Sequence, residues 1–319
     1  MWSLLACEMQ MSSEMVILTL VKLMKTQLPL LIVLGLLLFH CGPLLASESE
    51  GEGGDLNLKV HSYGVECSTV DMGDAAYSLR GVSVEAQKCH WQLGVMHQAY
   101  DWRNPDRFGV DTQGRDPWGS ITRLSFGFSH AGVLSEQWSG QILAGVSGEF
   151  EDELDDSLAV YAGGYGVYRW SPRLHAILGI FYSHHAEVET DFDVVPVIGL
   201  AWNPEAATGF SARLGLPITQ AQWTFDPQHR LLLDLNTLQG GVTRLADDNP
   251  LRPGGYIERV HASLVLRYET QFTESFLLST GVGYSLEREI TLYDSDGSEA
   301  FSSDVERGTS IEITLSKTF

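Results

Sequence analysis

One pattern recurs along most of this sequence: apolar and polar residues alternate over stretches of about ten residues. Successive side chains of a strand point to opposite faces, so each stretch predicts a strand with one apolar face. No segment keeps apolar residues at helical spacing over three turns, so we expect an all-β fold. In 275–287, where the pattern is clearest, the apolar parity holds Phe276, Leu278, Val282, Tyr284 and Leu286.

Fourteen stretches carry this pattern or a weaker form of it, and twelve remain if the first two lie outside a membrane. Most of them have the length of one membrane crossing, for which a tilted strand needs about 9–11 residues. The predicted strands are 57–68, 79–88, 90–101, 120–130, 137–150, 157–170, 173–184, 192–202, 209–215, 219–225, 230–237, 256–268, 275–287 and the stretch that ends at Phe319.

The connections between these stretches alternate in length. Counted back from Phe319, the long ones at 294–308, 241–255, 151–157 and 101–119 all fall on one side. A connection near Pro217 on that side is short, but it keeps the parity. Bacterial outer-membrane barrels have short periplasmic turns and longer extracellular loops, so the long loops, several of them acidic, are predicted to be extracellular.

An alternating strand needs a cover for its apolar face, and the sequence offers no helix for this purpose. Lipid can supply the cover if the sheet closes on itself, since each unpaired backbone group in lipid costs several kcal/mol. Tyr256 and Tyr268 bracket one apolar row, at a spacing that predicts one ring near each edge of an apolar band ~25 Å tall. We therefore predict a closed antiparallel transmembrane β-barrel of 12–14 strands, with a secreted soluble β-sandwich as the alternative.

The first part of the chain has a different character. Residues 24–46 predict a secretory signal peptide, because their apolar run is shorter than the ~20 residues of a spanning helix and Ala46 precedes an acidic stretch. Residues 1–23 are interpreted as an extension upstream of the true start, 47–56 as a disordered acidic lead-in, and 57–319 as the barrel. Export would place Cys67 and Cys89 in an oxidising compartment, but a simple hairpin would hold them too far apart for a disulfide.

The end of the chain resembles the C-terminal signal that bacterial outer-membrane barrels present to their insertion machinery. The matching residues are Ile311, Ile313, Leu315 and Phe319, whereas Lys317 departs from the pattern. This resemblance implies outer-membrane lipid, lipopolysaccharide and the insertion machinery as partners. The net charge of −21 and the absence of a basic stripe exclude nucleic acid.

Three stretches of the C-terminal half resemble a family of uncharacterised Gram-negative outer-membrane β-barrels, catalogued as a domain of unknown function. They are "LGLPITQAQWTFDPQHRLLLDL", "GGYIERVHASLVLRYETQFTESFLLSTGVGYSLEREITLYD" and the terminal strand. The resemblance covers residues 190–319 well and the rest loosely. It implies the fold and the location, and it brings neither catalytic residues nor a substrate.

Charged side chains on the polar parities are predicted to line the lumen, either as a structural salt-bridge ladder or as a selectivity lining. We expect Arg259 and Arg267 to pair with Glu287 and Glu289 on the neighbouring strand. The predicted lining residues are Arg123, Asp193, Arg213, Asp234, Arg259, His261, Arg267, Glu287 and Glu289.

No metal, cofactor or catalytic residue is predicted. His184 and His185 with nearby carboxylates resemble a metal site, but adjacent residues of a strand point to opposite faces. The run "DSDGSE" matches a calcium loop poorly, because Val305 stands where its last Glu is expected. A narrow or plugged passive channel, or a structural membrane protein, is the predicted function. An outer-membrane lipase- or protease-like enzyme is the alternative, with His175, His184, His185 and His261 as possible bases.

Overall fold

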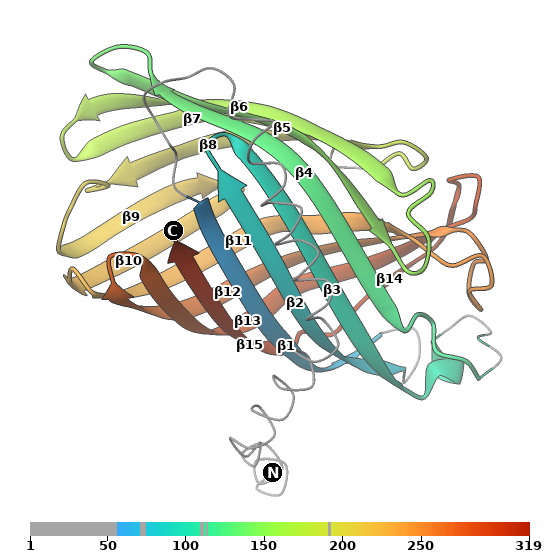
Figure 1. Ribbon diagram of the computed structural model, residues 1–319. Coiled ribbons are helices and arrows are strands. Elements are labelled where there is room, and N and C mark those ends of the chain that lie inside the picture. Colours follow the sequence, from blue (N-terminus) through green and yellow to red (C-terminus); the bar gives the residue numbers. More distant parts are fainter. Residues whose placement is uncertain (1–55, 71–74, 109–111, 113, 191–192) are drawn as a thin grey trace, which may run out of the picture. The chain divides into compact units, whose positions relative to one another are not determined.

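The computed structural model describes residues 56–70, 75–108, 112, 114–190 and 193–319. The predicted extension 1–23, the predicted signal 24–46 and nearly all of the lead-in lie outside these residues. The described chain is almost entirely strand (Figure 1), and its one helical turn is η1, Pro105–Arg107. None of its helices is long and apolar enough to cross a membrane.

The strands follow the predicted stretches closely, with one short strand, β14, that the alternation does not predict. Their bounds are β1 Leu56–Thr69, β2 Ala76–Lys88, β3 Trp91–Arg103, β4 Ser120–Val133, β5 Trp138–Phe150, β6 Leu158–Ser171, β7 Leu174–His185, β8 Val194–Trp202, β9 Gly209–Leu216, β10 Ile218–Asp226, β11 His229–Arg244, β12 Tyr256–Thr273, β13 Phe276–Tyr293, β14 Glu299–Asp304 and β15 Thr309–Thr318.

The sheet closes on itself, as predicted. Each strand from β1 to β13 pairs antiparallel with the next, β13 pairs with β15, and β15 pairs with β1, where Asn57 lies opposite Thr318. Both β14 and β15 pair with β13, at different heights, so β14 shares one lane with β15 and the 15 strands form a 14-lane barrel. The upper bound of the predicted strand count is therefore confirmed.

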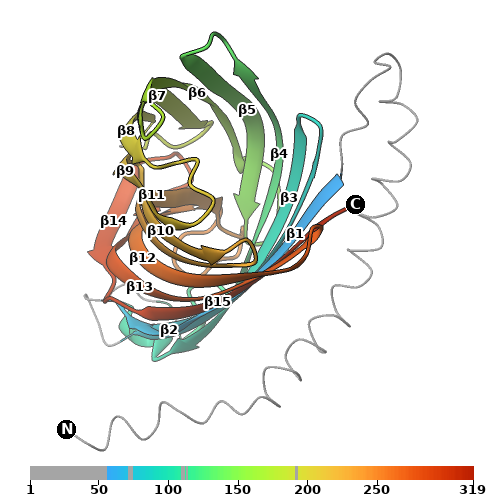
Figure 2. The same cartoon turned by 90° about the vertical axis from the view of Figure 1, so that its left-hand side faces the viewer.

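The two ends of the barrel differ, as the connection lengths predict. Short turns close one end, which faces the viewer in Figure 2 and carries the C-terminus beside the start of β1. Long connections close the other end, called the outer end below. The hairpin of β9 and β10 is the exception, because it turns at the cis peptide bond of Leu216–Pro217. The β1–β2 hairpin sets Leu56 opposite Lys88, so Cys67 and the free Cys89 lie at opposite ends.

The outward face of the barrel is an apolar band. Side chains at every second position project from it with large exposed fractions, such as 63% for Leu178 and 61% for Leu214. A soluble sandwich would bury these side chains against a second sheet, and here they face away from the barrel. The alternation therefore marks the lipid-facing surface of a transmembrane barrel.

Two β-bulges lie at about the same height in β11 and β13, the two strands that flank β12. The pairing of β11 with β12 shifts between Asn236 and Gln239, and that of β13 with β12 shifts across Leu286. A bulge bends its strand and increases the local twist. Beyond its own bulge, β11 reaches β5, where Arg244 pairs with Phe150.

One prediction about the lipid-facing row is wrong. Tyr256 does not lie at the edge of the apolar band, because only 3% of it is exposed and its ring meets His185 edge-on at 5.4 Å. Tyr268, at the other end of the row, is 43% exposed as predicted. The difference arises because the outer parts of β11 and β12 lie inside the arc formed by β6, β7 and β8, where Tyr256 meets His185 of β7.

Candidate functional site

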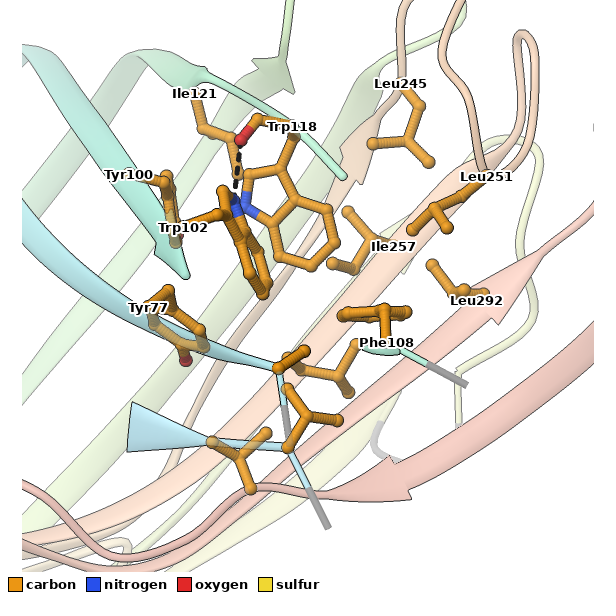
Figure 3. Close-up of a cluster of buried hydrophobic side chains, with 14 of the residues drawn as sticks. Tyr77, Tyr100, Trp102, Phe108, Trp118, Ile121, Leu245, Leu251, Ile257 and Leu292 are labelled. Carbon is orange, nitrogen blue, oxygen red and sulfur yellow. Dashed lines mark hydrogen bonds between the residues drawn. The ribbon is translucent and has the colours of Figure 1, made fainter. Parts of the chain in front are cut away.

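An apolar cluster, called the outer plug below, fills the interior of the barrel at its outer end. Its aromatic centre consists of side chains from β2, β3 and the connection before β4, with Trp102 Nε1 donating a hydrogen bond to Trp118 O at 2.8 Å (Figure 3). Trp118 is 1% exposed and Phe108 is fully buried. The members are Val70, Ala75, Tyr77, Leu79, Tyr100, Trp102, Phe108, Trp118, Ile121, Leu245, Leu251, Ile257, Ile290, Leu292 and Val305.

Packing of this kind leaves no free path through that part of the barrel. The plug joins β2–β4 on one wall to β12 and β13 on the other, and Leu245 and Leu251 cover it from the connection between β11 and β12. Protein interiors packed in this way hold few voids larger than a water molecule. The structure therefore shows a barrel that is plugged at the outer end on this side.

A buried ion-pair network lies beneath the outer plug. Glu149 on β5 is 3% exposed; it forms an ion pair with Arg123, whose Nε lies 2.8 Å away, and accepts hydrogen bonds from Arg259 and, at 2.6 Å, from Thr243 Oγ1. Arg259 also donates to Tyr100 and, at 2.8 Å, to Gln98 Oε1. This network connects β3, β4, β5, β11 and β12 across the lumen.

A second network of charged side chains lies closer to the inner end of the barrel. Arg267 pairs with Asp234 and, from Nε at 3.1 Å, with Glu312 of β15. Gln220 Nε2 donates to Asp234 Oδ1 at 2.6 Å, which leaves Asp234 with two partners while it is only 4% exposed. A carboxylate buried in this way needs such partners, since its desolvation is costly.

The remaining predicted lining residues behave differently. His261 lies close enough to the charged side chains of Arg288, Arg259 and Arg123 to be repelled by them when it is protonated. Arg213 of β9 makes no ion pair with any residue that the structure describes. Asp193 sits just before β8 at the outer end, where its carboxylate pairs with His184 Nδ1 at 3.3 Å.

The prediction for Glu287 and Glu289 is wrong. The bulge at Leu286 reverses the parity of β13, so Arg288, Ile290 and Leu292 point inward beyond it while both glutamates are exposed. Glu289 instead accepts from Ser302 Oγ of β14 at 2.6 Å. The expected pairing of these glutamates with Arg259 and Arg267 is therefore absent.

Sequence reasoning missed two carboxylates that complete these networks. Glu149 lies on the polar parity of its strand, but it begins the acidic run "EFEDELDD", which reads as a solvated loop. Glu312 lies on the polar parity of the terminal strand, whose apolar row carries the predicted insertion signal. Parity alone would have placed both in the lumen.

The other candidate features are found as follows. No group of metal-ligating side chains occurs among the described residues. Asp191, one of the carboxylates that follow His184 and His185 in the sequence, lies outside the described residues. His184 pairs with Asp193, and His185 Nδ1 accepts from the Glu187 backbone N–H at 3.2 Å. These contacts lend the enzymatic alternative no support. Ile311, Leu315 and Phe319 are exposed on the outward face, and Lys317 Nζ lies 4.5 Å from the centre of the Phe319 ring.

A cavity of about 340 Å³ lies beside the ion-pair network. Its walls belong to β5–β8 on one side and to β11 and β12 on the other. This volume is within the range of small-molecule sites, about 300–1,000 Å³. The interior of the outer half thus holds a filled part, the outer plug, and a hollow part.

No protein-family model and no curated protein matches the chain. Similar solved structures include an outer membrane channel from Pseudomonas putida F1, with 8% identity, a TM-score of 0.43, and 86% of this chain and 98% of that one covered. KdgM porin is similar with 8% identity, a TM-score of 0.34, and 82% and 99% covered. The Pseudomonas putida toluene transporter TodX has 8% identity, a TM-score of 0.31, and 84% and 90% covered. The chain has the barrel that its resemblance to the uncharacterised family implies, while its function has to be argued from its own geometry.

Proposed function

We propose that this barrel is a narrow passive channel of a bacterial outer membrane, restricted by the outer plug. The observation that carries this proposal is the combination of a closed lipid-facing ring with a charged lumen whose apolar plug, among the described residues, lies at the outer end. The cavity beside the ion-pair network adds space inside the barrel that a purely structural role does not require. At 14 strands the interior is wider than in the eight-stranded barrels that side chains fill completely.

The outer membrane as the location is part of this proposal. It is supported by short turns at one end and long connections at the other, which is the arrangement of outer-membrane barrels. The outward row of Ile311, Leu315 and Phe319 fits a C-terminal signal that the insertion machinery would bind. Carboxylates in the outer connections, such as Asp294 and Asp296, fit divalent-cation bridges to lipopolysaccharide phosphates.

Planar-bilayer recording tests the channel proposal. Trp118→Ala removes the centre of the outer plug, so we expect a larger single-channel conductance than in the wild type. The loss of this packing should also lower the free energy of unfolding by about 3–5 kcal/mol. Trp170→Ala is the matched control, because Trp170 is 72% exposed on β6 and touches no plug residue. Silence of both the wild type and Trp118→Ala would contradict a channel.

A further inference from the structure

The wall of the barrel is incomplete in its outer half. On the side of β9, β8 pairs only from Ile198 to Trp202, so residues 194–197 have no neighbour there among the described strands. Pairing of β11 with β10 ends at Asn236, and Thr237 N–H donates to Pro217 O at 3.1 Å. Residues 238–243 then have no described strand on that side, which leaves about 20 Å of open strand edge.

Two prolines border this gap. Pro196 lies in the part of β8 that pairs with β7 but has no partner on the side of β9. Pro217 forms the tip of the β9–β10 hairpin below it. Proline has no N–H to donate and is found in sheets at edges. The sequence is therefore built to leave this edge unpaired.

The bulged part of β11 closes a smaller ring instead. It leaves the wall and meets β5, and Glu151 N–H donates to Arg244 O at 2.9 Å. A glycine allows this close approach, since a Cβ on Gly241 would lie 3.1 Å from Glu149 Oε2 of β5. The outer plug fills this smaller ring, and the arc of β6–β8 remains outside it.

The cavity lies between that arc and the smaller ring. Phe181 and Val195 come from the inward face of β7 and β8. Val260 comes from the face of β12 that carries the exposed Leu266 and Tyr268, which is the lipid-facing one. A cavity lined by the inner face of one wall and the outer face of the other lies directly behind the gap between β8 and β11, which offers it a sideways opening.

The lining combines apolar side chains with about as many polar ones, and several of the polar groups have partners among the described residues. Arg123 is paired with Glu149, and Glu258 accepts from Tyr293 at 2.7 Å. His185 is different: it is 3% exposed, and although the Ser157 backbone lies near its ring, its buried Nε2 has no partner at good hydrogen-bond geometry among the described residues. Because Nδ1 accepts from the Glu187 N–H, the proton is on Nε2, which is a donor without an acceptor.

We propose that this side chamber takes up a neutral, mainly apolar molecule that carries one hydrogen-bond-accepting oxygen, and exchanges it with the membrane through the gap between β8 and β11. The acceptor oxygen satisfies His185 Nε2, and the apolar body contacts Ala159, Phe181, Val195 and Val260. An anionic head group is disfavoured, because Glu258 lies in the lining and the nearest cation is paired. This inference names a solute class for the proposed channel, although ligand binding does not depend on ion conduction.

Binding is tested with the fluorescent ketone prodan and the purified full barrel. We expect saturable prodan fluorescence that 2-decanone displaces better than decane. Ala159→Trp fills the chamber from β6 and should abolish this signal, and Val260→Trp fills it from the opposite wall in case the first variant does not fold. Ala162→Trp is the control, because Ala162 is exposed on the lipid face of the same strand. Equal binding in the filled and control variants would overturn the proposal.

The His185→Phe variant tests the polar contact. It should weaken 2-decanone by about 2- to 10-fold, the value of one neutral hydrogen bond, and leave decane unchanged. An equal effect on both competitors would contradict the role of Nε2.

The sideways opening is tested with spin labels in lipid bilayers, after Cys67→Ser and Cys89→Ser. A label at Val195→Cys should be as accessible to oxygen as one at the lipid-facing Leu266→Cys, and shielded from a water-soluble nickel chelate. A label at the lumenal Gln141→Cys, whose side chain accepts from Tyr165 at 2.7 Å, should show the reverse. If Val195→Cys behaves like Gln141→Cys, the chamber opens to water and the proposal fails, whatever conductance the barrel shows.

Discussion

Glu149 is the residue on which the outer half of the lumen depends. Two arginines and one threonine from three different strands converge on its carboxylate, and it is almost fully buried. Its charge is compensated by Arg123 and Arg259, whose own burial is tolerable only because this partner is present. The carboxylate also lies at the contact between β5 and β11, so it fixes where the bulged strand ends.

Replacing Glu149 by glutamine should therefore be costly. Glu149→Gln leaves two arginines without a compensating charge, and we expect the free energy of unfolding to fall by about 3–5 kcal/mol. Denaturant unfolding in detergent, followed by gel mobility, measures this. Glu287→Gln is the matched control at an exposed position and should change stability by no more than about 0.5 kcal/mol. Equal effects of the two substitutions would refute the network.

At this scale the sequence predicts the side of the strand but not the partner. Alternation places Arg123, Arg259 and Arg267 in the lumen, where the structure has them. Their carboxylates come from strands far away in the sequence, such as Glu312 for Arg267. No local pattern encodes which side chains meet across a lumen, because that depends on the register of the whole ring.

Among the elements, β13 shows how one extra residue changes the surface that a strand presents. Before Leu286 its even positions face lipid, and beyond it Ile290 and Leu292 join the outer plug. The alternation in the sequence continues without a break through this point. Apolar side chains are equally suited to lipid and to the plug, so the reversal has no signature in the sequence.

Deleting Leu286 tests the function of this bulge. Because Ser285 lies opposite Ser263 and Glu287 opposite Ala262, the deletion keeps Ile290 and Leu292 facing inward and removes only the bend that the bulge gives to β13. We expect the loss of this bend to disturb the packing of Ile290 and Leu292 in the plug, so the deletion should refold less well in detergent than the wild type, measured as the fraction with heat-modifiable gel mobility. Leu286→Ala keeps the bulge and should refold nearly as the wild type does. A deletion variant that refolds as well as Leu286→Ala would show that the bulge is dispensable.

For the whole molecule, the direction of every strand follows from one orientation. Cys89 lies in the turn between β2 and β3, is exposed and has no disulfide partner among the residues that the structure describes. If the long connections face outward, a membrane-impermeant maleimide should not label Cys89 on intact cells in a Cys67→Ser background. Ser298→Cys, in the connection between β13 and β14, should be labelled. The opposite pattern would invert the proposed topology.

The closed ring, the strand number and the difference between the ends could be predicted, since lipid imposes them on any chain of this pattern. The side chamber could not. It exists because β9 and β10 are short while β11 is bulged, and each of these features is unremarkable by itself. Only their common height in the assembled barrel turns them into a gap.

The arc of β6–β8 has a mechanical consequence. In the outer half it is attached along one edge, through β5, whereas every lane of the inner half is braced by two neighbours. A plate clamped on one side bends far more easily than a tube. We therefore expect bilayer thickness and lateral tension to deform this arc first, and with it the gap between β8 and β11.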